Sequence, residues 1–276
     1  MKSEITSRKS PTKIVFIGAG NMAEAMARGI LASNIYRPGD MLAADIDKSR
    51  LAFFRRKLGI KGLADNKKAA ATAEIIVLAV KPQQAPQVLD DLRGNLQGNP
   101  LLISIVTGFS VKKIADALAM PPRIIRVVPN TPALAGTGAS AYCRGRAATA
   151  RDEKLAARIL NSIGVAVRLD EPLMNAATAL SGSGPAYTLY LIEALLEAGR
   201  QMGLPDGAAR LLTIATVGGT ACLQVKTGLP AEELRRRVTS RGGTTAAAVK
   251  ILDRAGTRRT IIAAVKAAHR RAQELS

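Results

Sequence analysis

The stretch "VTSRGGTTAAAV", residues 238–249, has the residue types of a binding site for a small anion. Gly242 and Gly243 lie among hydroxyl side chains, and a helical pattern of apolar residues follows them. Free N–H groups at a helix N-terminus bind carboxylates, and a neighbouring hydroxyl can hydrogen-bond a ring nitrogen. The stretch has no His, Cys, Asp or Glu, so it offers no strong acid, base or metal ligand. The structural interpretation is a simple turn between two helices, capped by Thr244 or Thr245.

A second glycine motif, "IGAGNMAEAM", places Gly18, Gly20 and Ala23 in a G-x-G-x-x-A spacing after a predicted strand. In a dinucleotide site the first glycine permits a tight turn, the second lets the backbone approach a pyrophosphate, and the small third residue allows helix and strand to pack. Asp45 ends the second predicted strand, where a carboxylate normally binds the ribose. The motif therefore predicts a dinucleotide site.

Two further turns follow predicted strands. "AVKPQQ" ends the fourth strand, so we expect Ala79, Val80 and Lys81 to face the cofactor and a helix to begin at Pro82. A Lys81 that is merely solvated would fit the same pattern. "VVPNTPA" ends a later strand and places Asn130, Thr131 and Pro132 in a rigid turn.

The elements that position these residues follow an α/β pattern. Short apolar runs alternate with amphipathic segments, which indicates a parallel sheet with helices on both faces, a Rossmann-type doubly wound sheet. A strand at "ASAYC", a helix over 152–163 and a strand at "VAVRL" follow. The strand signals then stop, so we predict a dinucleotide-binding domain over 1–172 and an all-α dimerisation and substrate-binding domain over 173–276.

Residues 211–225, "LLTIATVGGTACLQV", are uncharged on every side. They fall short of the roughly 20 residues needed to span a bilayer, and a helix apolar all round must be buried all round. Few other helices are available to cover it, and Gly218 and Gly219 would let a second backbone approach closely. The segment therefore predicts an obligate homodimer and no membrane span.

The formal net charge is +19, which is compatible with nucleic acid, an anionic membrane surface or anionic small molecules as partners. Because the basic residues are scattered and only 3% of residues are aromatic, we expect no nucleic-acid function and a solvated basic surface. Cys143 and Cys222 match no disulfide framework or metal spacing, and the first residues lack a secretory signal. These features predict a cytoplasmic protein.

The reaction class is limited by the scarcity of acid–base groups. His269 is the only histidine and lies between basic residues near the end of the sequence. Alcohol dehydrogenation usually needs a base or zinc, whereas the nitrogen of a cyclic imine is already basic and can arrive protonated. Hydride transfer to such an imine needs mainly orientation and exclusion of water.

Five blocks of the sequence together resemble one known family. They are "IGAGNMAEA", "AVKP", "RVVPNTPA", "TALSGSGPAY" and "VTSRGGTTAA", in this order. From Lys13 onward the chain resembles pyrroline-5-carboxylate reductases, the last enzymes of proline biosynthesis. The resemblance implies a Rossmann domain, a helical dimerisation domain and often a decamer of five dimers. It also implies that NADP(H) or NAD(H) reduces 1-pyrroline-5-carboxylate to L-proline.

The resemblance assigns roles to individual residues. Thr245 is the expected catalytic residue, as the partner of the substrate's ring nitrogen. The expected substrate-binding residues are Val238, Ser240, Gly242, Gly243, Thr244 and Thr245, together with Ser181, Gly182, Ser183, Gly184 and Pro185. The expected cofactor-binding residues are Gly18, Ala19, Gly20, Asn21, Met22, Asp45, Asn66, Ala79, Val80, Lys81, Asn130, Thr131 and Pro132. No metal site is expected.

The substrate and the cofactor stay open at this point. Arg241 stands where family members often have Pro, and Lys226 stands where an acid is common. A related imine reductase therefore remains an alternative function. Two further alternatives are a β-hydroxyacid dehydrogenase of the same two-domain architecture and a non-catalytic dinucleotide-binding paralogue. The resemblance favours NADPH as the cofactor, whereas Asp45 favours NADH, and Lys48 or Arg50 could reach a phosphate.

Overall fold

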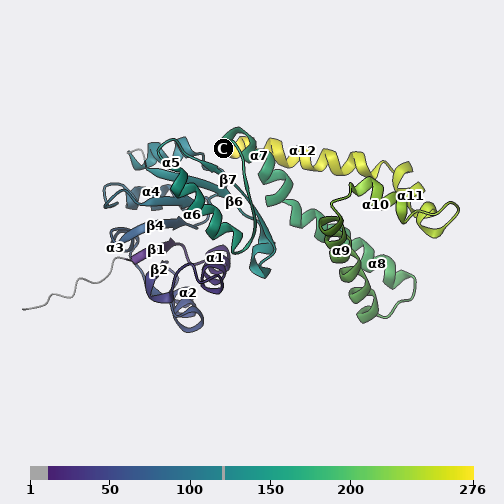
Figure 1. Ribbon diagram of the computed structural model, residues 1–276, viewed down its shortest axis with the longest axis horizontal. Coiled ribbons are helices and arrows are strands. Elements are labelled where there is room, and N and C mark those ends of the chain that lie inside the picture. Colours follow the sequence, from purple (N-terminus) through teal and green to yellow (C-terminus); the bar gives the residue numbers. More distant parts are fainter. Residues whose placement is uncertain (1–11, 120–121) are drawn as a thin grey trace, which may run out of the picture. The chain divides into compact units, whose positions relative to one another are not determined.

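The computed structural model describes residues 12–119 and 122–276 (Figure 1). The chain forms two compact units. The sheet unit comprises the chain up to Gly182 together with His269–Ser276, and the helical unit comprises Ser183–Ala268. The units divide after Gly182, whereas the sequence pattern places the domain boundary after Pro172.

The sheet unit is built on eight strands in the order β3-β2-β1-β4-β5-β6-β7-β8. The strands are β1 (Thr12–Ile17), β2 (Met41–Ala44), β3 (Lys61–Leu63), β4 (Ala73–Leu78), β5 (Leu101–Ser104), β6 (Arg123–Val128), β7 (Gly138–Arg144) and β8 (Gly164–Arg168). All neighbouring strands are parallel except β6 and β7. Only residues 129–137 join β6 to β7, which is shorter than the dozen or so residues that a parallel crossover usually needs.

Helices cover both faces of the sheet, which confirms the doubly wound prediction (Figure 1). Because side chains alternate along a strand, Phe16 of β1 faces one core and Ile17 faces the other. The first core takes residues from α1 (Asn21–Ala32), from η2 (Phe54–Leu58), which continues α2 (Lys48–Phe53), and from α6 (Ala150–Asn161). The second takes residues from α3 (Asn66–Ala70), α4 (Ala85–Leu92) and α5 (Val111–Leu118).

One helix start was predicted wrongly. The helix expected at Pro82 is α4, and it begins at Ala85. Residues 81–84 instead form a turn in which the Gln84 N–H donates to the Lys81 carbonyl at 2.9 Å. Pro86 lies in the first helical turn, where its missing N–H is not needed.

The segment after β8 packs on the sheet unit, which explains why the unit extends to Gly182. It contains η4 (Glu171–Leu173), α7 (Met174–Ala177) and η5 (Thr178–Gly182). Met174 is fully buried with Val128, Ala141 and Cys143. This burial keeps the segment with the strands.

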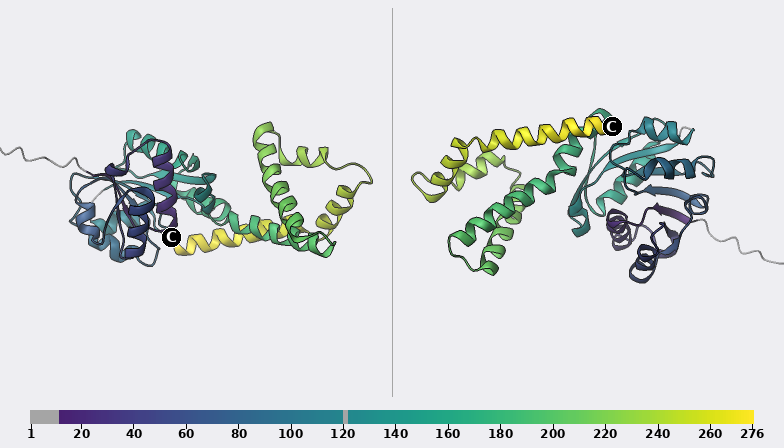
Figure 2. Two further views of the ribbon diagram at one scale, coloured as in Figure 1. Left: turned by 90° about the horizontal axis from the view of Figure 1, so that it is seen from below. Right: turned by 180° about the vertical axis from the view of Figure 1, so that it is seen from behind.

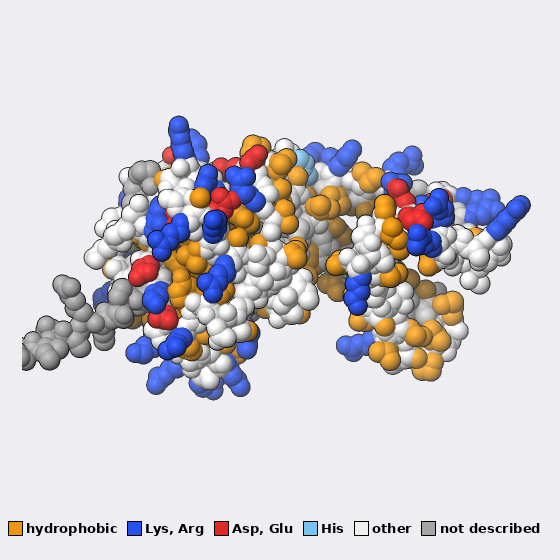
Figure 3. All heavy atoms as spheres, in the orientation of Figure 1, with side chains coloured by type: hydrophobic (Ala, Val, Ile, Leu, Met, Phe, Trp, Pro, Cys, Tyr) orange, Lys and Arg blue, Asp and Glu red, His pale blue; other side chains and the backbone are white. Residues whose placement is uncertain are grey.

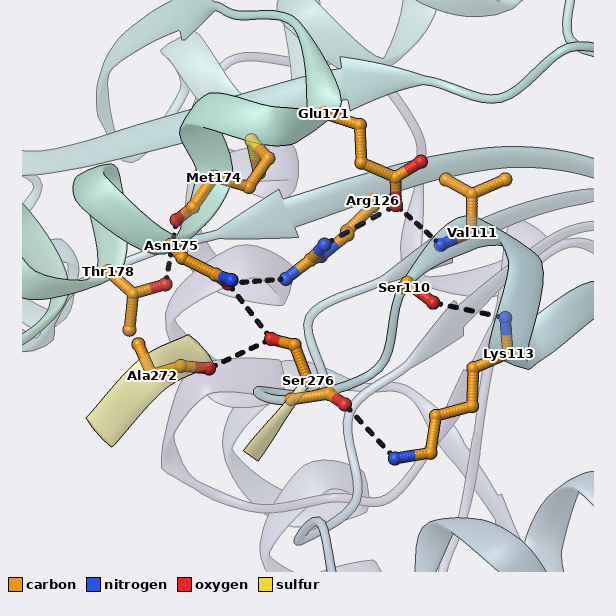
Figure 4. Close-up of polar contacts among 11 residues, drawn as sticks. Ser110, Val111, Lys113, Arg126, Glu171, Met174, Asn175, Thr178, Ala272 and Ser276 are labelled. Carbon is orange, nitrogen blue, oxygen red and sulfur yellow. Dashed lines mark hydrogen bonds and ion pairs between the residues drawn. The ribbon is translucent and has the colours of Figure 1, made fainter. Parts of the chain in front are cut away.

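A buried arginine joins three separate parts of the sheet unit (Figure 4). Arg126 of β6 contacts Glu171 at 3.3 Å and donates to the Asn175 side chain at 3.4 Å. The Ser276 hydroxyl also donates to Asn175, at 2.9 Å. Residues 269–276, the end of α12 (Thr257–Leu275) and Ser276, are thereby fixed to the sheet unit (Figure 2).

The helical unit contains α8 (Gly184–Gln201), α9 (Asp206–Thr227), α10 (Ala231–Arg237), α11 (Thr244–Arg254) and the first part of α12. Helix α8 packs on α9, where a Cβ on Gly199 would lie 3.2 Å from the Ala209 Cβ. Apolar side chains gather on the exposed surface of this pair (Figure 3). The side chain of Leu211 is 72% exposed and that of Val225 is 84% exposed, so one chain alone leaves α9 largely uncovered.

Helix α9 is also long and apolar enough to cross a membrane by length and composition, a test that buried helices of soluble proteins pass as well.

Candidate active site

A cavity of about 600 Å³ lies where the carboxyl ends of β1, β2 and β4 meet. It brings together seven of the residues predicted to bind the cofactor. They are Gly18, Gly20, Asp45, Asn66, Ala79, Val80 and Lys81. Parallel strands explain this convergence, because their carboxyl ends share one edge of the sheet.

Other predicted cofactor residues lie outside this lining. They are Ala19, Asn21, Met22, Asn130, Thr131 and Pro132. Arg50, expected from the sequence to be able to reach a phosphate, lies in the lining, and Lys48 does not. The cavity also includes residues that the sequence did not indicate, namely Ile46, Asp47, Gln83, Gln84, Gln87 and Asp91, among others. Ile46 and Asp47 follow β2 and Gln83 and Gln84 follow the "AVKP" turn, so their positions in the sequence could have indicated them, whereas Gln87 and Asp91 lie within α4.

The two motif glycines have different surroundings. Gly18 has a φ of +95°, and a Cβ there would lie 2.6 Å from the Ala79 carbonyl oxygen, so both backbone conformation and space require glycine. A Cβ on Gly20 would meet nothing within 4 Å. Gly20 is the N-cap of α1 and supplies no side-chain cap, so it leaves the first N–H groups of α1 without an acceptor from the capping side chain. This is the arrangement that accepts an anion.

Asp45 is bound into the glycine loop. One carboxylate oxygen accepts the Ala19 N–H at 2.6 Å, and the other accepts the Asp47 N–H at 2.9 Å. Asp47 in turn caps α2 by accepting the Ser49 N–H at 2.8 Å, and hydrogen bonding from Ser49 lowers the pKa of Asp47. The loop after β2 therefore holds two carboxylates at the cavity.

Arg50 lines the same cavity, and its side chain is held by Ala19, just before α1, and by Glu24 in α1. Its Nε donates to the Ala19 carbonyl at 2.7 Å, its Nη2 donates to Glu24 at 2.9 Å, and its guanidinium lies 4.9 Å from the ring centroid of Phe53. Burial alone would raise the pKa of Glu24, but hydrogen bonds from Arg50 and Arg28 lower it below its usual value. Glu24 is therefore an anion that holds Arg50 in place.

Asn130 and Ser181 contact each other and are not part of this cavity's lining. The Asn130 side-chain oxygen accepts the Ala139 N–H at 2.8 Å, and its amide nitrogen donates to the Ser181 carbonyl at 3.2 Å. The Ser181 hydroxyl donates to the Ala139 carbonyl at 3.3 Å. These two predicted site residues thus fix η5 to the end of β6.

Gly182, another predicted substrate residue, ends η5 in the sheet unit, and the remaining predicted substrate residues belong to the helical unit. Ser183, Gly184 and Pro185 form the start of α8, and residues 238–245 lead into α11. The cap prediction for Thr244 or Thr245 was wrong, because Gly243 is the N-cap of α11 and no side chain caps it. A Cβ on Gly243 would collide with the Ser240 hydroxyl as it stands, so a larger residue there would force the Ser240 side chain to turn. Within the described residues, the Thr245 hydroxyl has no hydrogen-bond partner.

Comparisons with known proteins agree with this arrangement. Residues 171–275 match the family described as pyrroline-5-carboxylate reductase dimerisation, and residues 13–108 match the family described as NADP oxidoreductase, coenzyme F420-dependent. A pyrroline-5-carboxylate reductase of Synechocystis is 39% identical over 94% of this chain and 96% of its own length. One of Arabidopsis thaliana is 36% identical over 96% of this chain and 95% of its own length.

Two solved structures are similar throughout. A pyrroline-5-carboxylate reductase from Coxiella burnetii has a TM-score of 0.89 and 37% identity, covering 97% of this chain and 99% of its own. The Plasmodium falciparum pyrroline carboxylate reductase with NADP bound has a TM-score of 0.87 and 32% identity, covering 96% of this chain and 98% of its own. With near-complete coverage in both directions, the chain belongs to the pyrroline-5-carboxylate reductase family.

Proposed function

We propose that this protein reduces 1-pyrroline-5-carboxylate to L-proline with NADPH or NADH, the last step of proline biosynthesis. The observation that carries the proposal is the cavity at the strand ends, where Gly20 leaves the N-terminus of α1 open. Family membership supplies the substrate class.

The residues present fit a dinucleotide. The open N-terminus of α1 would bind the pyrophosphate, and Asp45 lies at the end of β2, where the ribose is expected. The Ala79–Lys81 turn and Asn66 complete the lining. When bound, the reduced nicotinamide supplies a hydride.

Residues of the helical unit would hold the substrate. We assign its carboxylate to the Ser240 hydroxyl, the Gly243 N–H and Thr244, at the N-terminus of α11. Arg241 is exposed beside them and adds attraction for the anion. Thr245 would hydrogen-bond the ring nitrogen.

The chemistry requires little from these side chains. A protonated cyclic imine accepts the hydride at carbon, the C=N π electrons move to nitrogen, and the proton already on nitrogen stays there. The product is the secondary amine of proline. Orientation and exclusion of water are therefore the protein's main contributions.

We also propose that the protein works as a cytoplasmic homodimer assembled through the helical unit, without a nucleic-acid or membrane partner. The exposed apolar surface of α9 and the match to a dimerisation family support the dimer. Five such dimers in a decamer are the larger assembly that the family resemblance implies. Both cysteines are free, in keeping with a reducing compartment.

The test is oxidation of NADPH and NADH with and without 1-pyrroline-5-carboxylate, with the product identified as proline. Oxidation that depends on the substrate supports the proposal. Faster turnover of another cyclic imine or of a β-hydroxyacid would reassign the substrate. Cofactor binding without any turnover would indicate a non-catalytic paralogue.

A further inference from the structure

We infer that Asp45 and Glu24 together make this protein select NADH over NADPH. Asp45 presents a fixed carboxylate where the ribose binds, and Glu24 holds Arg50 away from the role of phosphate ligand. The inference rests on the proposed use of a dinucleotide cofactor, and Glu24 acts as a positioning residue.

Backbone hydrogen bonds fix the orientation of the Asp45 carboxylate. Its two backbone hydrogen bonds, to Ala19 and Asp47, use one acceptor site on each carboxylate oxygen. Each oxygen keeps a second lone pair for another donor. A ribose hydroxyl can donate to it, whereas the 2'-phosphate of NADPH has mainly acceptor oxygens and a like charge. Because the backbone bonds fix the carboxylate, it cannot easily turn away from a phosphate.

Arg50 is the cation that could offset this repulsion, and Glu24 holds it. Arg50 is the arginine in the cavity lining, and an ion pair at 2.9 Å joins it to Glu24. The side chain of Glu24 is only 16% exposed, and the Arg50 guanidinium also bonds the Ala19 carbonyl. Two of the three guanidinium nitrogens, Nε and Nη2, are thereby held, so Arg50 cannot move toward a 2'-phosphate without giving up contacts that are shielded from water, where charge pairs are stronger.

The other charges at the cavity include more carboxylates than cations. The lining contains the carboxylates of Asp45, Asp47 and Asp91 and the cations of Arg50 and Lys81. Lys48 follows Asp47 directly, but it is exposed and lies outside the lining. The large positive charge of the whole chain attracts both cofactors and discriminates weakly between them. Local charge at the ribose therefore decides the preference.

The experiment measures kcat/KM for NADH and NADPH in the wild-type protein and four variants. Asp45→Asn should shift the ratio toward NADPH by roughly tenfold, because it removes a like charge in a partly wet site. Glu24→Gln should shift it in the same direction by a smaller factor, because Arg50 is released. Adding Arg50→Met to Glu24→Gln should cancel that shift. Arg28→Gln, which removes the other cation paired with Glu24 outside the cavity, should leave the ratio unchanged.

Three results would overturn the inference: a wild-type preference for NADPH, an unchanged ratio in Asp45→Asn, or a Glu24→Gln shift that persists without Arg50. Thermal melting identifies a variant that fails to fold, and Asp45→Ser then replaces Asp45→Asn. Dissociation constants of both cofactors, measured by fluorescence without substrate, separate this inference from the proposed function. If the binding ratio shifts as expected while 1-pyrroline-5-carboxylate is not reduced, only the proposed reaction fails.

Discussion

At the scale of single residues, Thr245 tests the proposed reaction most directly. Thr245→Val keeps the shape of the side chain but removes the hydroxyl, and Thr245→Ser keeps the hydroxyl. We expect Val to lower turnover by an amount corresponding to about 1 to 4 kcal/mol at the transition state, the cost of one lost donor in a water-poor site. Ser should largely preserve turnover. Steady-state kinetics of both variants measure the effect. If both variants keep the wild-type rate and substrate affinity, Thr245 does not have the proposed role.

Cys143 gives a second prediction, on stability at high pH. Burial is the main cause that raises the pKa of this thiol from 9.0 to about 11. A group whose pKa is higher in the folded state stabilises the fold fully below the unfolded pKa, and this contribution is lost as pH rises through the folded pKa. The free energy of unfolding should therefore fall as pH rises from about 9 toward 11.

Urea unfolding of the wild-type protein and of Cys143→Ala at a series of pH values measures this contribution. The variant lacks the titrating group, so its stability should fall less over the same interval. If both proteins lose stability in parallel, other groups cause the alkaline transition.

The role of Asp45 shows what sequence reasoning could reach at this scale. Its position after an apolar strand and a glycine motif was enough to predict that it lines the cavity, as it does. Its bond to Ala19 spans 26 positions and arises from the pairing of β1 with β2, so no local pattern reports it. The Glu24–Arg50 pair depends on tertiary packing in the same way.

At the scale of elements, α1 packs tightly against the end of α6 at Gly29. A Cβ on Gly29 would lie 2.5 Å from the Ile163 Cγ2 and 2.6 Å from the Ser162 hydroxyl. Gly29→Ala should therefore destabilise the fold by roughly 1 to 3 kcal/mol through overpacking, despite the better helix propensity of alanine. Thermal or urea unfolding measures the loss.

Gly39→Ala is the matched control, because a Cβ at Gly39 meets nothing within 4 Å. It should change stability little. Equal stability of the two variants would mean that the contact between α1 and residues 162–163 relaxes without cost.

The elements differ in how well sequence predicts them. Continuous apolar runs such as "EIIVLAV" predict buried strands, and β4 and its neighbours lie where expected. The sequence count makes the "AVKPQQ" strand the fourth, as it is, but no residues could be assigned to the third strand. Strand β3, Lys61–Leu63, is short and mostly exposed, so burial leaves no hydrophobic pattern. The antiparallel direction of β7 was missed because pairing direction depends on the connection rather than on the strand's own residues.

At the scale of the whole molecule, the exposed face of α9 predicts that no active monomer exists. A Cβ on Gly218 or Gly219 would meet nothing within 4 Å in the single chain, and Leu211 lies on the same uncovered helix. Dilution below the dimer dissociation constant should abolish activity and folding together. Analytical ultracentrifugation with parallel assays tests this, and a fully active monomer would contradict it.

Leu211→Glu should produce the same loss at concentrations where the wild-type protein is assembled, because it places a charge in the expected interface. Gln97→Glu adds the same charge to an exposed position of the sheet unit and is the control. Loss of assembly in both variants would point to net charge rather than to α9.

The discontinuity of the sheet unit has a consequence for synthesis on the ribosome. Residues 269–276 complete that unit, yet they are made only after all of the helical unit, residues 183–268. At about 5 to 20 residues per second, the intervening segment takes roughly 4 to 17 s to make. During that time the surface that Ala272 later covers stays open, and Asn175 lacks its partner Ser276. The nascent sheet unit therefore stays incomplete until residues 269–276 have emerged.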